Sequence, residues 1–404
     1  MTGLLQGIRV VETGVLMGVD NLGRLLGDEG ADVVKVESPQ LGDYLRNIMT
    51  RFAPDWSMYH VALNRNKRSV TVDARTAQGR ALMARLVSDA DVFITGNVGA
   101  TNERLGLGYA TLHALNPRLV YCQVTGFGAS GPYAEIPTHG QMMDQLGART
   151  PQLELADGAT RTVPGSNSPD TLGVVVGPLH AAFGVASALV RRSITGTGCY
   201  LDVSCADAVL AARWLDAIRE LNPQCIDSTG PTANPAESAK YQNYQTSDGK
   251  FVLFCAIEAK FWDHFCSAVD RADLCSDHRR DLVVDFAGGD ENALLRMELQ
   301  RIFHTRTLTE WMALAAEHDI AIGPALQLAE VRDDPHLIAR GMIVAEHHPT
   351  LGDFDTLGNP LHTPGESFVL RSAPSLGEHT DEVLAELGYD DTARAALRAD
   401  GVIR

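Results

Sequence analysis

The sequence predicts an α/β fold whose larger domain is built on a parallel sheet. Two short apolar runs, residues 7–13 and 31–37, are typical of buried strands. Between them, residues 20–29 carry leucines at helical spacing and stop before Gly30, which is typical of a helix end. A strand–helix–strand unit makes a right-handed crossover, so its two strands are expected to lie parallel.

The same alternation continues through the first half of the chain. Strands are predicted at 68–74, 91–97 and 119–128, with a helix over 76–88. A glycine- and alanine-rich apolar helix follows, and a further strand begins at Cys199. Ligands of open α/β sheets bind beyond the carboxyl ends of the strands. The rim expected there comprises Gly14–Gly18, Leu63–Lys67, Asn97, Arg104 and Thr125–Gly128.

A change of composition near residue 222 predicts a domain boundary. The residues beyond it are rich in Pro, Ser, Thr and Asn, which is typical of a linker. Farther on, Ser247–Gly249 lies between two apolar runs and predicts a hairpin, and Thr307–Glu310 resembles a helix capping box. The expected domains are a large domain over 1–221, a linker over 222–240, a smaller α+β domain over 241–335 and a C-terminal segment over 336–404 that returns to the large domain.

Composition and charge limit the partners of the chain. Its 404 residues carry a net charge of −17, which argues against a nucleic-acid-binding surface. No basic leader and no apolar run of the roughly 18 residues that a membrane span needs is evident, so we expect no membrane contact. Seven cysteines form no C-x-x-C pair, which is typical of reduced thiols in a cytoplasmic protein. The histidines lack zinc spacing, and GxGxxG and P-loop motifs are missing, so neither a metal nor a dinucleotide is expected.

Asp170 is the leading candidate for chemistry. It lies just before the apolar central helix, where backbone N–H groups and the helix dipole favour an anion. His139, on a neighbouring loop, could supply an imidazole. A carboxylate so placed is a candidate nucleophile or base, although it could equally be a simple helix cap. Three cations in the run 63–68 (LNRNKR) could hold a polyphosphate or form a solvated charged surface.

Several motifs in one order resemble the family III CoA-transferases, which include α-methylacyl-CoA racemases and carnitine CoA-transferase-like enzymes. They are GDEGADVVKVESPQLGD, LNRNKRSVTVD, RLGLGYATLHALNPRLVYCQVTGFGASGPYAEIP and ALVRRSITGTGCYLDVSCADAVL. The resemblance implies a Rossmann-like large domain, an interlocked homodimer or a pairing with a second gene product, and a CoA thioester as substrate with no permanently bound cofactor. The residues expected to contact CoA are Leu63, Asn64, Lys67, Arg68, Asn97, Arg104 and Gly126.

The resemblance leaves three functions open. The main hypothesis is racemisation of a 2-methyl-branched acyl-CoA, in which His139 and Asp170 exchange the α-proton and Glu258 orients the histidine. Glu258 favours this hypothesis because AIEAKFW resembles a racemase-like pattern. The alternative is CoA transfer to a carboxylic acid, with Asp170 as the nucleophile. A gap-free alignment from Thr195–Gly196 instead places the catalytic position near Val174, which would make the chain a non-catalytic CoA-binding subunit.

The acyl group is not predicted directly. Its shape is expected to depend on the loop 44–60, on Met142 and Met143, and on Phe261 and Trp262 of the smaller domain. These side chains are typical of either a roomy apolar pocket or a packed core.

Overall fold

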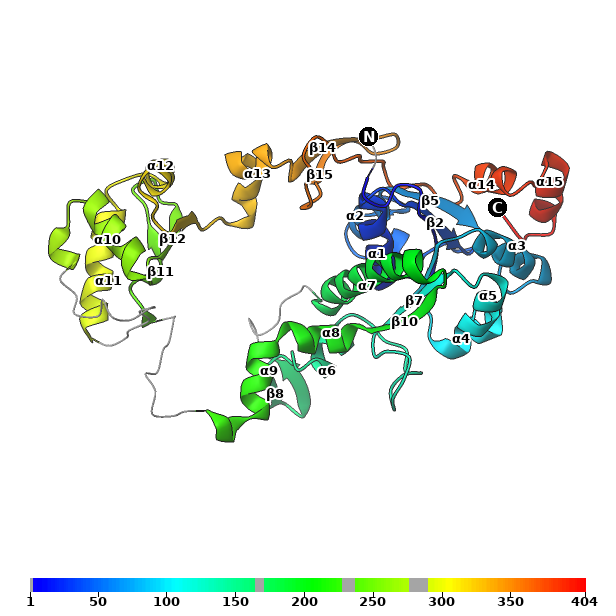
Figure 1. Ribbon diagram of the computed structural model, residues 1–404, viewed down its shortest axis with the longest axis horizontal. Helices are drawn as coiled ribbons and strands as arrows, with labels where there is room; N and C mark the ends of the chain where they lie inside the picture. Colours follow the sequence, from blue (N-terminus) through cyan, green and yellow to red (C-terminus); the bar gives the residue numbers. More distant parts are fainter. Residues whose placement is uncertain (1–2, 164–170, 227–236, 276–289) are drawn as a thin grey trace. The chain divides into compact units, whose positions relative to one another are not determined.

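A computed structural model describes residues 3–163, 171–226, 237–275 and 290–404, and it divides the chain into two compact units. The first unit combines Met1–Leu221 with Gly341–Arg404, and the second comprises Asn222–Arg340 (Figure 1). Asp170 lies outside the described residues.

The first unit is built on a six-stranded sheet, and every pairing within it is parallel. Its strands are β1 (Arg9–Thr13), β2 (Asp32–Glu37), β5 (Lys67–Thr71), β6 (Val92–Thr95), β7 (Val120–Thr125) and β10 (Cys199–Ser204). Their spatial order is β10-β7-β6-β1-β2-β5. The predicted α/β class and parallel sheet are therefore confirmed. The strand order reverses between β1 and β6, which is the switch point where ligands of such sheets bind.

Helices cover both faces of this sheet. Val10 and Val33 belong to a buried core with helices α1 (Met17–Asp28) and α7 (Gly173–Thr195), which lie side by side (Figure 1). The next residues along the same strands, Val11 and Val34, face a second core. The helices in that core are α3 (Ala77–Ser88), α5 (Tyr109–Leu115) and α14 (Thr380–Glu386). Because both faces are buried, β1, β2 and β6 each contain adjacent apolar residues, which explains why the sequence predicted them well.

Shorter elements complete the first unit. They are the 3-10 helix η1 (Tyr44–Asn47), the helices α2 (Met58–Asn64), α4 (Gly99–Leu105), α6 (Gln141–Leu146), α8 (Cys205–Ala212), α9 (Trp214–Leu221) and α15 (Asp391–Ala399), and the hairpins β3–β4 (Arg51–Ala53, Trp56–Ser57), β8–β9 (Leu153–Ala156, Ala159–Thr162) and β14–β15 (Ile343–His348, Gly352–Leu357). A further short helix, α13 (Pro335–Ala339), belongs to the second unit. The sequence analysis did not predict these three hairpins.

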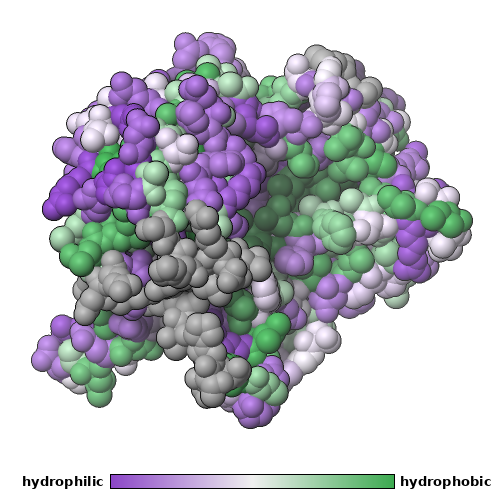
Figure 2. Space-filling model, turned by 60° about the vertical axis from the view of Figure 1, so that its left-hand side comes forward, coloured by the Kyte–Doolittle hydropathy of each residue, from purple (hydrophilic) through white to green (hydrophobic). Residues whose placement is uncertain are grey.

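Helix α7 is apolar around most of its circumference. Among the described residues it is the one helix long and apolar enough to cross a membrane, judged by length and composition only, so the expectation that no such stretch exists was wrong. A core helix passes the same test, and Ala181 and Val185 are fully buried against the sheet. The opposite face leaves Phe183 75% and Ile194 82% exposed. Figure 2 shows hydrophobic side chains exposed among hydrophilic ones on the face that it presents.

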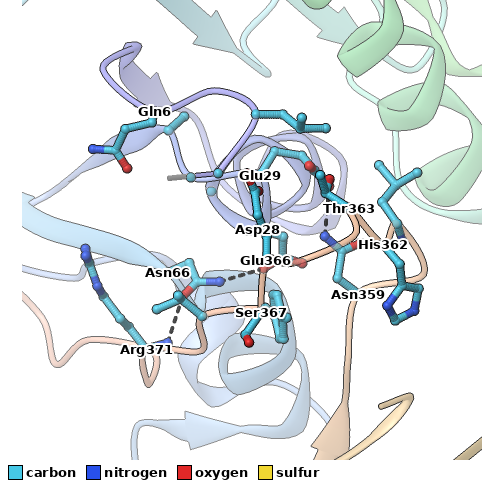
Figure 3. A pocket seen from close by; sticks show the side chains of 18 residues that line it. Gln6, Asp28, Glu29, Asn66, Asn359, His362, Thr363, Glu366, Ser367 and Arg371 are labelled. Carbon is cyan, nitrogen blue, oxygen red and sulfur yellow. Dashed lines mark hydrogen bonds between the residues drawn. The ribbon is translucent and has the colours of Figure 1, made fainter. Parts of the chain in front are cut away.

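The C-terminal segment closes over the end of α1. Asn66 and Arg371 exchange two hydrogen bonds, of 2.9 and 2.7 Å, and Asn359 donates to Glu29 at 2.8 Å (Figure 3). These contacts line a small polar cavity of about 140 Å³. The cavity therefore lies at a joint between two distant segments of the first unit.

The second unit is a small α+β assembly. Its sheet has the order β11-β12-β13, with strands Tyr241–Gln245, Phe251–Cys255 and Ile322–Pro324. The β11–β12 pairing is antiparallel, which confirms the predicted hairpin. Three helices, α10 (Ala259–Ala268), α11 (Asp290–Phe303) and α12 (Leu308–His318), pack with it around a buried aromatic core, and the Thr307–Glu310 capping box at the start of α12 is confirmed.

Candidate active site

A large cleft opens in the first unit beside the start of α7. It has a volume of about 1080 Å³, and Leu16 and Met17, which follow β1 at the switch point, line one wall. Its other lining residues come from η1 and the loop after it, from α2, from the segment 139–145 and from the first turn of α7. They are Asn21, Tyr44, Ile48, Met49, Thr50, Met58, Tyr59, Ala62, Leu63, His139, Gly140, Gln141, Met142, Gln145, Thr171, Val174 and Val175.

The cleft brings together residues that the sequence analysis named separately. His139 and Leu63 both line it, although they are far apart in the chain. Thr171, the residue directly after Asp170, lines it as well. Val174 also contributes to the wall, and its carbonyl accepts a hydrogen bond of 2.9 Å from Asn21 of α1. The start of α7, with Val174, and His139 therefore belong to one region of the fold.

The expected pocket-forming side chains divide between the cleft and the cores. Met142 and several residues of the loop 44–60 line the cleft. Met143 is instead buried in the core beneath the sheet, and Trp262 is buried in the core of the second unit. The sequence could not separate these cases because methionine and aromatic residues serve both purposes.

Asp144 fixes the first turn of α7. Its carboxylate, 5% exposed, accepts hydrogen bonds from the backbone N–H groups of Leu172 at 3.0 Å and Gly173 at 2.8 Å. Arg149 donates to the same carboxylate at 2.9 Å. An anion at a helix N-terminus is favoured by the free N–H groups and the dipole. Asp144 thus fills a capping role that the sequence analysis had considered for Asp170, and no local signal revealed it because the partners are 28 residues apart.

Gly126 holds the loop that carries His139. A Cβ atom at this position would lie 2.5 Å from Cβ and 2.6 Å from Cγ2 of Thr138. The missing side chain therefore allows the segment before His139 to lie against the end of β7. Gly126 was expected to contact CoA, and in the structure its observed role is this close backbone packing.

Hydroxyl groups line the carboxyl edge of the sheet. Thr13, Thr95 and Thr125 are the last residues of β1, β6 and β7, and all three are buried. The Thr95 hydroxyl donates to Asn102, whereas those of Thr13 and Thr125 have no hydrogen-bond partner among the described residues. Because buried polar groups are normally paired, two hydroxyls without a partner among the described residues indicate that the carboxyl edge of the sheet suits a polar ligand.

A sequence model of CoA-transferase family III matches residues 5–380. The chain belongs to this family. It is 27% identical to formyl-CoA:oxalate CoA-transferase of Rhodopseudomonas palustris (strain BisA53) over 430 residues, covering 100% of this chain and 98% of the relative. It is 28% identical to formyl-CoA:oxalate CoA-transferase of Escherichia coli O157:H7 over 432 residues, covering 100% of both chains.

Solved structures agree with this membership. A CAIB/BAIF family protein from Brucella suis superposes with a TM-score of 0.71 at 29% identity, covering 96% of this chain and 100% of that one. The protein Rv3272 from M. tuberculosis superposes with a TM-score of 0.72 at 26% identity, covering 94% and 99%. The predicted resemblance to family III is therefore confirmed. The relatives support the transferase alternative, and the main hypothesis of a racemase is not supported.

Two of the expected CoA contacts lie deep inside the family III fold. The Lys67 ammonium is fully buried and lies 2.9 Å from Glu12, and it also donates to the Asn64 side chain at 3.0 Å. Asn64 in turn donates to Asp20 at 2.9 Å and contacts the ring of His60. These side chains support the wall of the cleft from behind, because their polar atoms are occupied by the protein itself. Their contact with CoA stays a prediction.

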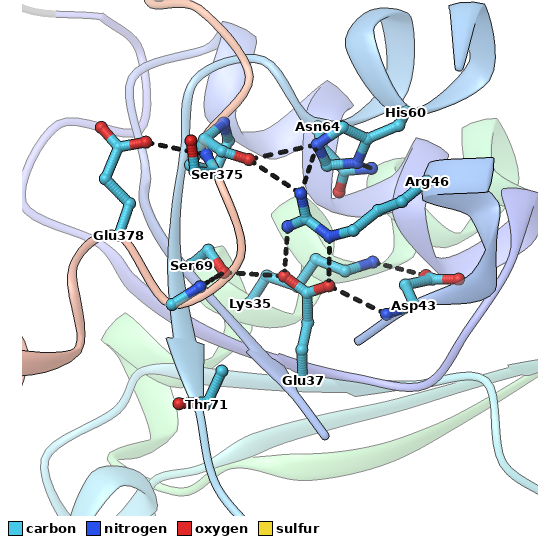
Figure 4. Close-up of polar contacts among 12 residues, drawn as sticks. Lys35, Glu37, Asp43, Arg46, His60, Asn64, Ser69, Thr71, Ser375 and Glu378 are labelled. Atoms are coloured by element: carbon cyan, nitrogen blue, oxygen red, sulfur yellow. Dashed lines mark hydrogen bonds and ion pairs between the residues drawn. The ribbon is translucent and has the colours of Figure 1, made fainter. Parts of the chain in front are cut away.

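The buried charges continue around Lys35 and Arg46 (Figure 4). Lys35 pairs with Asp20, with Asp43 at 2.8 Å and with Glu12 at 3.4 Å. The Asp43 carboxylate also accepts the backbone N–H of Leu16, a cleft residue, at 3.2 Å. Since Leu16 has a positive φ of 70°, this hydrogen bond helps to hold a turn that a leucine rarely adopts. The charges thereby shape the β1–α1 turn that forms one wall of the cleft.

Arg46 joins the charge network to the C-terminal segment. It forms a two-pronged ion pair with Glu37, at 2.6 and 2.9 Å, and donates to the carbonyl of Pro374 at 3.1 Å (Figure 4). Burial alone would raise the pKa of Glu37, but the hydrogen bonds from Arg46 and the charge of Lys35 lower it to about 2. Burial lowers the pKa of His60 to about 3, with a further contribution from the positive charge of Arg46. Burial raises the pKa values of Asp20 and Asp43.

The remaining expected CoA contacts lie nearer the surface. Arg68 is half-buried and pairs with Asp32 at 2.6 Å and Glu386 at 2.7 Å. Asn97, just after β6, accepts through its carbonyl from Gln123 at 3.0 Å. Arg104 is exposed on α4 and donates to Thr101 at 3.4 Å.

Glu258 belongs to the second unit. It is half-buried at the N-cap of α10, where its carbonyl accepts the N–H of Trp262 at 3.1 Å and its side chain makes no capping hydrogen bond. Its predicted action on His139 stays a prediction. Within the described ranges, no group of three or more His, Cys, Asp or Glu side chains could hold a metal ion.

Proposed function

We propose that this chain is a CoA-transferase that moves CoA from an acyl-CoA to a carboxylic acid, with Asp170 as the nucleophile. The observation that carries the proposal is the cleft at the start of α7, where Thr171, next to Asp170, lines a large cavity together with His139. Membership of family III and the names of the relatives, formyl-CoA:oxalate CoA-transferases, support the reaction class.

The proposed reaction needs only one carboxylate from the protein, and each turnover replaces the donor's thioester by one thioester on the acceptor. The Asp170 carboxylate attacks the thioester carbonyl and releases CoA thiolate, which leaves a mixed anhydride of Asp170 and the acyl group. The thiolate then attacks the Asp170 carbonyl and releases the first carboxylate, which gives an Asp170–CoA thioester. The acceptor carboxylate attacks this thioester, and the released thiolate attacks the acceptor carbonyl of the new anhydride. The products are the new acyl-CoA and free Asp170.

The surrounding residues suit these steps. The wall of the cleft is largely apolar, and an environment poor in water protects anhydride and thioester intermediates from hydrolysis. Asp144, by holding the N–H groups of Leu172 and Gly173, fixes the backbone two residues beyond Asp170. The free hydroxyls of Thr13 and Thr125 offer hydrogen bonds to a ligand at the carboxyl edge. We propose Leu63 and Arg104 as further CoA contacts, because the first lines the cleft and the second is exposed.

A non-catalytic role is the second candidate, because Val174 lines the same cleft. If Val174 occupied the catalytic position, the wall there would offer an apolar side chain, 8% exposed, with no nucleophile. The chain would then bind CoA thioesters without transferring CoA.

Transfer by the purified chain tests the proposal. The protein is incubated with butanoyl-CoA and each of a set of free carboxylic acids, and new acyl-CoA products are followed by mass spectrometry. We expect transfer that depends on the acceptor and that falls by at least a thousandfold in Asp170→Ala, because no second nucleophile replaces the carboxylate. His139→Ala should retain measurable transfer.

Two results would contradict the proposal. Binding of butanoyl-CoA without transfer to any acid would favour the non-catalytic role. Exchange of the α-proton of a 2-methylacyl-CoA in heavy water, without an acceptor and without transfer of CoA, would support the racemase hypothesis instead.

A further inference from the structure

We infer that the cleft accepts the apolar chain of a monocarboxylic acid, so this transferase works on bulky apolar acyl groups rather than on a small dicarboxylate such as oxalate. The inference rests on the proposed transfer and adds the class of acyl group. Its basis is the chemistry of the cleft wall.

The wall of the cleft is apolar and adaptable. Four methionines line it, Met17, Met49, Met58 and Met142, together with Leu63 and Val175. Methionine is unbranched and polarisable, so it adjusts to ligands of different shape. The volume of about 1080 Å³ is at the upper end of small-molecule sites, which commonly measure about 300–1,000 Å³. Such a wall stabilises an acyl chain by removing its methylene groups from water.

A second carboxylate would find no counter-charge here. None of the described residues that line the cleft is Lys, Arg, Asp or Glu. A buried carboxylate without a partner cation is strongly unfavourable. A monocarboxylic acid avoids this cost, because its one carboxylate is the group that reacts at Asp170.

Cations close to the cleft are paired with carboxylates of the protein. Arg24 donates to the lining residue Asn21 and pairs with Asp28 at 2.8 Å, and Arg149 pairs with Asp144 at 2.9 Å. Lys35 and Lys67 lie behind the wall, fully buried, and each has carboxylate partners, Asp20 and Asp43 for the first and Glu12 for the second. Neither ammonium lines the cleft. Polar side chains that do line it, such as Gln141 and Gln145, are neutral amides, suited to a carbonyl rather than to a dianion.

A chain-length series tests the inference. With butanoyl-CoA as donor, kcat/KM is measured for acetate, butanoate, hexanoate, octanoate and oxalate as acceptors. We expect kcat/KM to rise about fourfold for each methylene until the cleft is filled, since one buried methylene contributes the corresponding free energy. Oxalate should react more slowly than acetate. A preference for oxalate, or rates independent of chain length, would overturn the inference while leaving the transferase intact.

A charge placed in the wall should reverse the preference. Met142, 40% exposed on α6, is replaced in Met142→Lys, which should lower kcat/KM for hexanoate at least tenfold and raise the ratio of oxalate to hexanoate. Val175→Lys, in the first turn of α7, is a second variant with the same expectation. The matched control is Met297→Lys, which changes an exposed methionine of α11 in the second unit and should alter neither acceptor. Unchanged preference in both folded cleft variants would contradict the inference.

A binding measurement separates this inference from the proposed function. If the unmodified protein transfers CoA to none of the acids, the affinities of acetyl-CoA and hexanoyl-CoA are compared by calorimetry. Hexanoyl-CoA should then bind at least tenfold more tightly, through the same apolar wall. Equal affinities for acetyl-CoA and hexanoyl-CoA would overturn the inference, whether or not the protein transfers CoA.

Discussion

The groups buried near the β1–α1 turn include a neutral histidine, which makes the stability of the fold depend on pH. His60 is fully buried, contacts Asn64 through Nδ1 and lies 3.1 Å from the Pro374 carbonyl through Nε2. Its pKa is about 3 in the folded protein against an ordinary 6.5. Below pH 6.5 the unfolded chain therefore takes up a proton that the folded protein refuses, so stability falls as the pH falls from 6.5 towards 3.

Replacing this histidine should flatten the pH dependence. In His60→Gln the amide can replace the ring hydrogen bonds but does not titrate. We expect the free energy of unfolding, measured by urea denaturation between pH 6.5 and 4.5, to lose up to about 1.4 kcal/mol less per pH unit than in the wild type. The control, His336→Gln, changes an exposed histidine and should leave the slope as it is. Equal slopes in wild type and His60→Gln would show that His60 is not held neutral.

Gly126 should matter for activity more than for stability. In Gly126→Ala the new methyl group would meet Thr138 and displace the loop that leads to His139. We expect kcat/KM for transfer to fall at least tenfold with the fold retained by circular dichroism. Adding Thr138→Gly should restore part of the activity, because the clash is removed. The control Gly323→Ala places a methyl group in open space and should have no effect on transfer.

At the scale of elements, the start of α7 depends on a single carboxylate from α6. Asp144→Ala would leave two buried N–H groups, those of Leu172 and Gly173, without their acceptor. We expect a loss of about 1–3 kcal/mol in the free energy of unfolding, measured by urea denaturation, with a smaller loss for Asp144→Asn. In both variants kcat should fall more than the affinity for CoA, since Asp170 precedes this turn. Asp157→Asn, on the exposed β8–β9 hairpin, is the control that should change neither. Full stability in Asp144→Ala would contradict the capping role.

Elements were predictable from the sequence where burial is two-sided. Adjacent valines in β1 and β2 face the two cores on opposite sides of the sheet, so both strands could be identified directly. The β8–β9 hairpin could not, because its residues are mostly exposed and show no inward-facing apolar set. Long-range contacts were equally hidden. The residues next to Lys67 in the chain do not predict its ion pair with Glu12. Those next to Asp144 do not predict its hydrogen bonds to the first turn of α7.

The whole molecule places its candidate chemistry unevenly between its two units. The cleft, His139 and the start of α7 belong to the first unit, whereas Glu258 belongs to the second. The sequence located the cleft region because ligand sites of open α/β sheets follow the carboxyl ends of strands at the switch point. The sequence could not decide between racemase and transferase, because both activities use the same carboxylate. In the racemase this carboxylate would exchange an α-proton, and in the transferase it would attack the thioester carbonyl. The relatives, which are named formyl-CoA:oxalate CoA-transferases, favour the transferase.

The central claim is that Asp170 forms an anhydride with each acyl group and a thioester with CoA. The transfer of oxygen from the acceptor to Asp170 tests this claim most directly. In the proposed cycle the acceptor carboxylate leaves one of its oxygens on Asp170. The tryptic peptide 162–191 contains Asp170 as its single side-chain carboxylate, so its mass reports on that residue alone. After turnover with butanoyl-CoA and hexanoate labelled with heavy oxygen, we predict heavy oxygen in this peptide. Omitting either substrate should leave the peptide unlabelled. Rapid transfer of CoA to labelled hexanoate with no label in the peptide would contradict the claim.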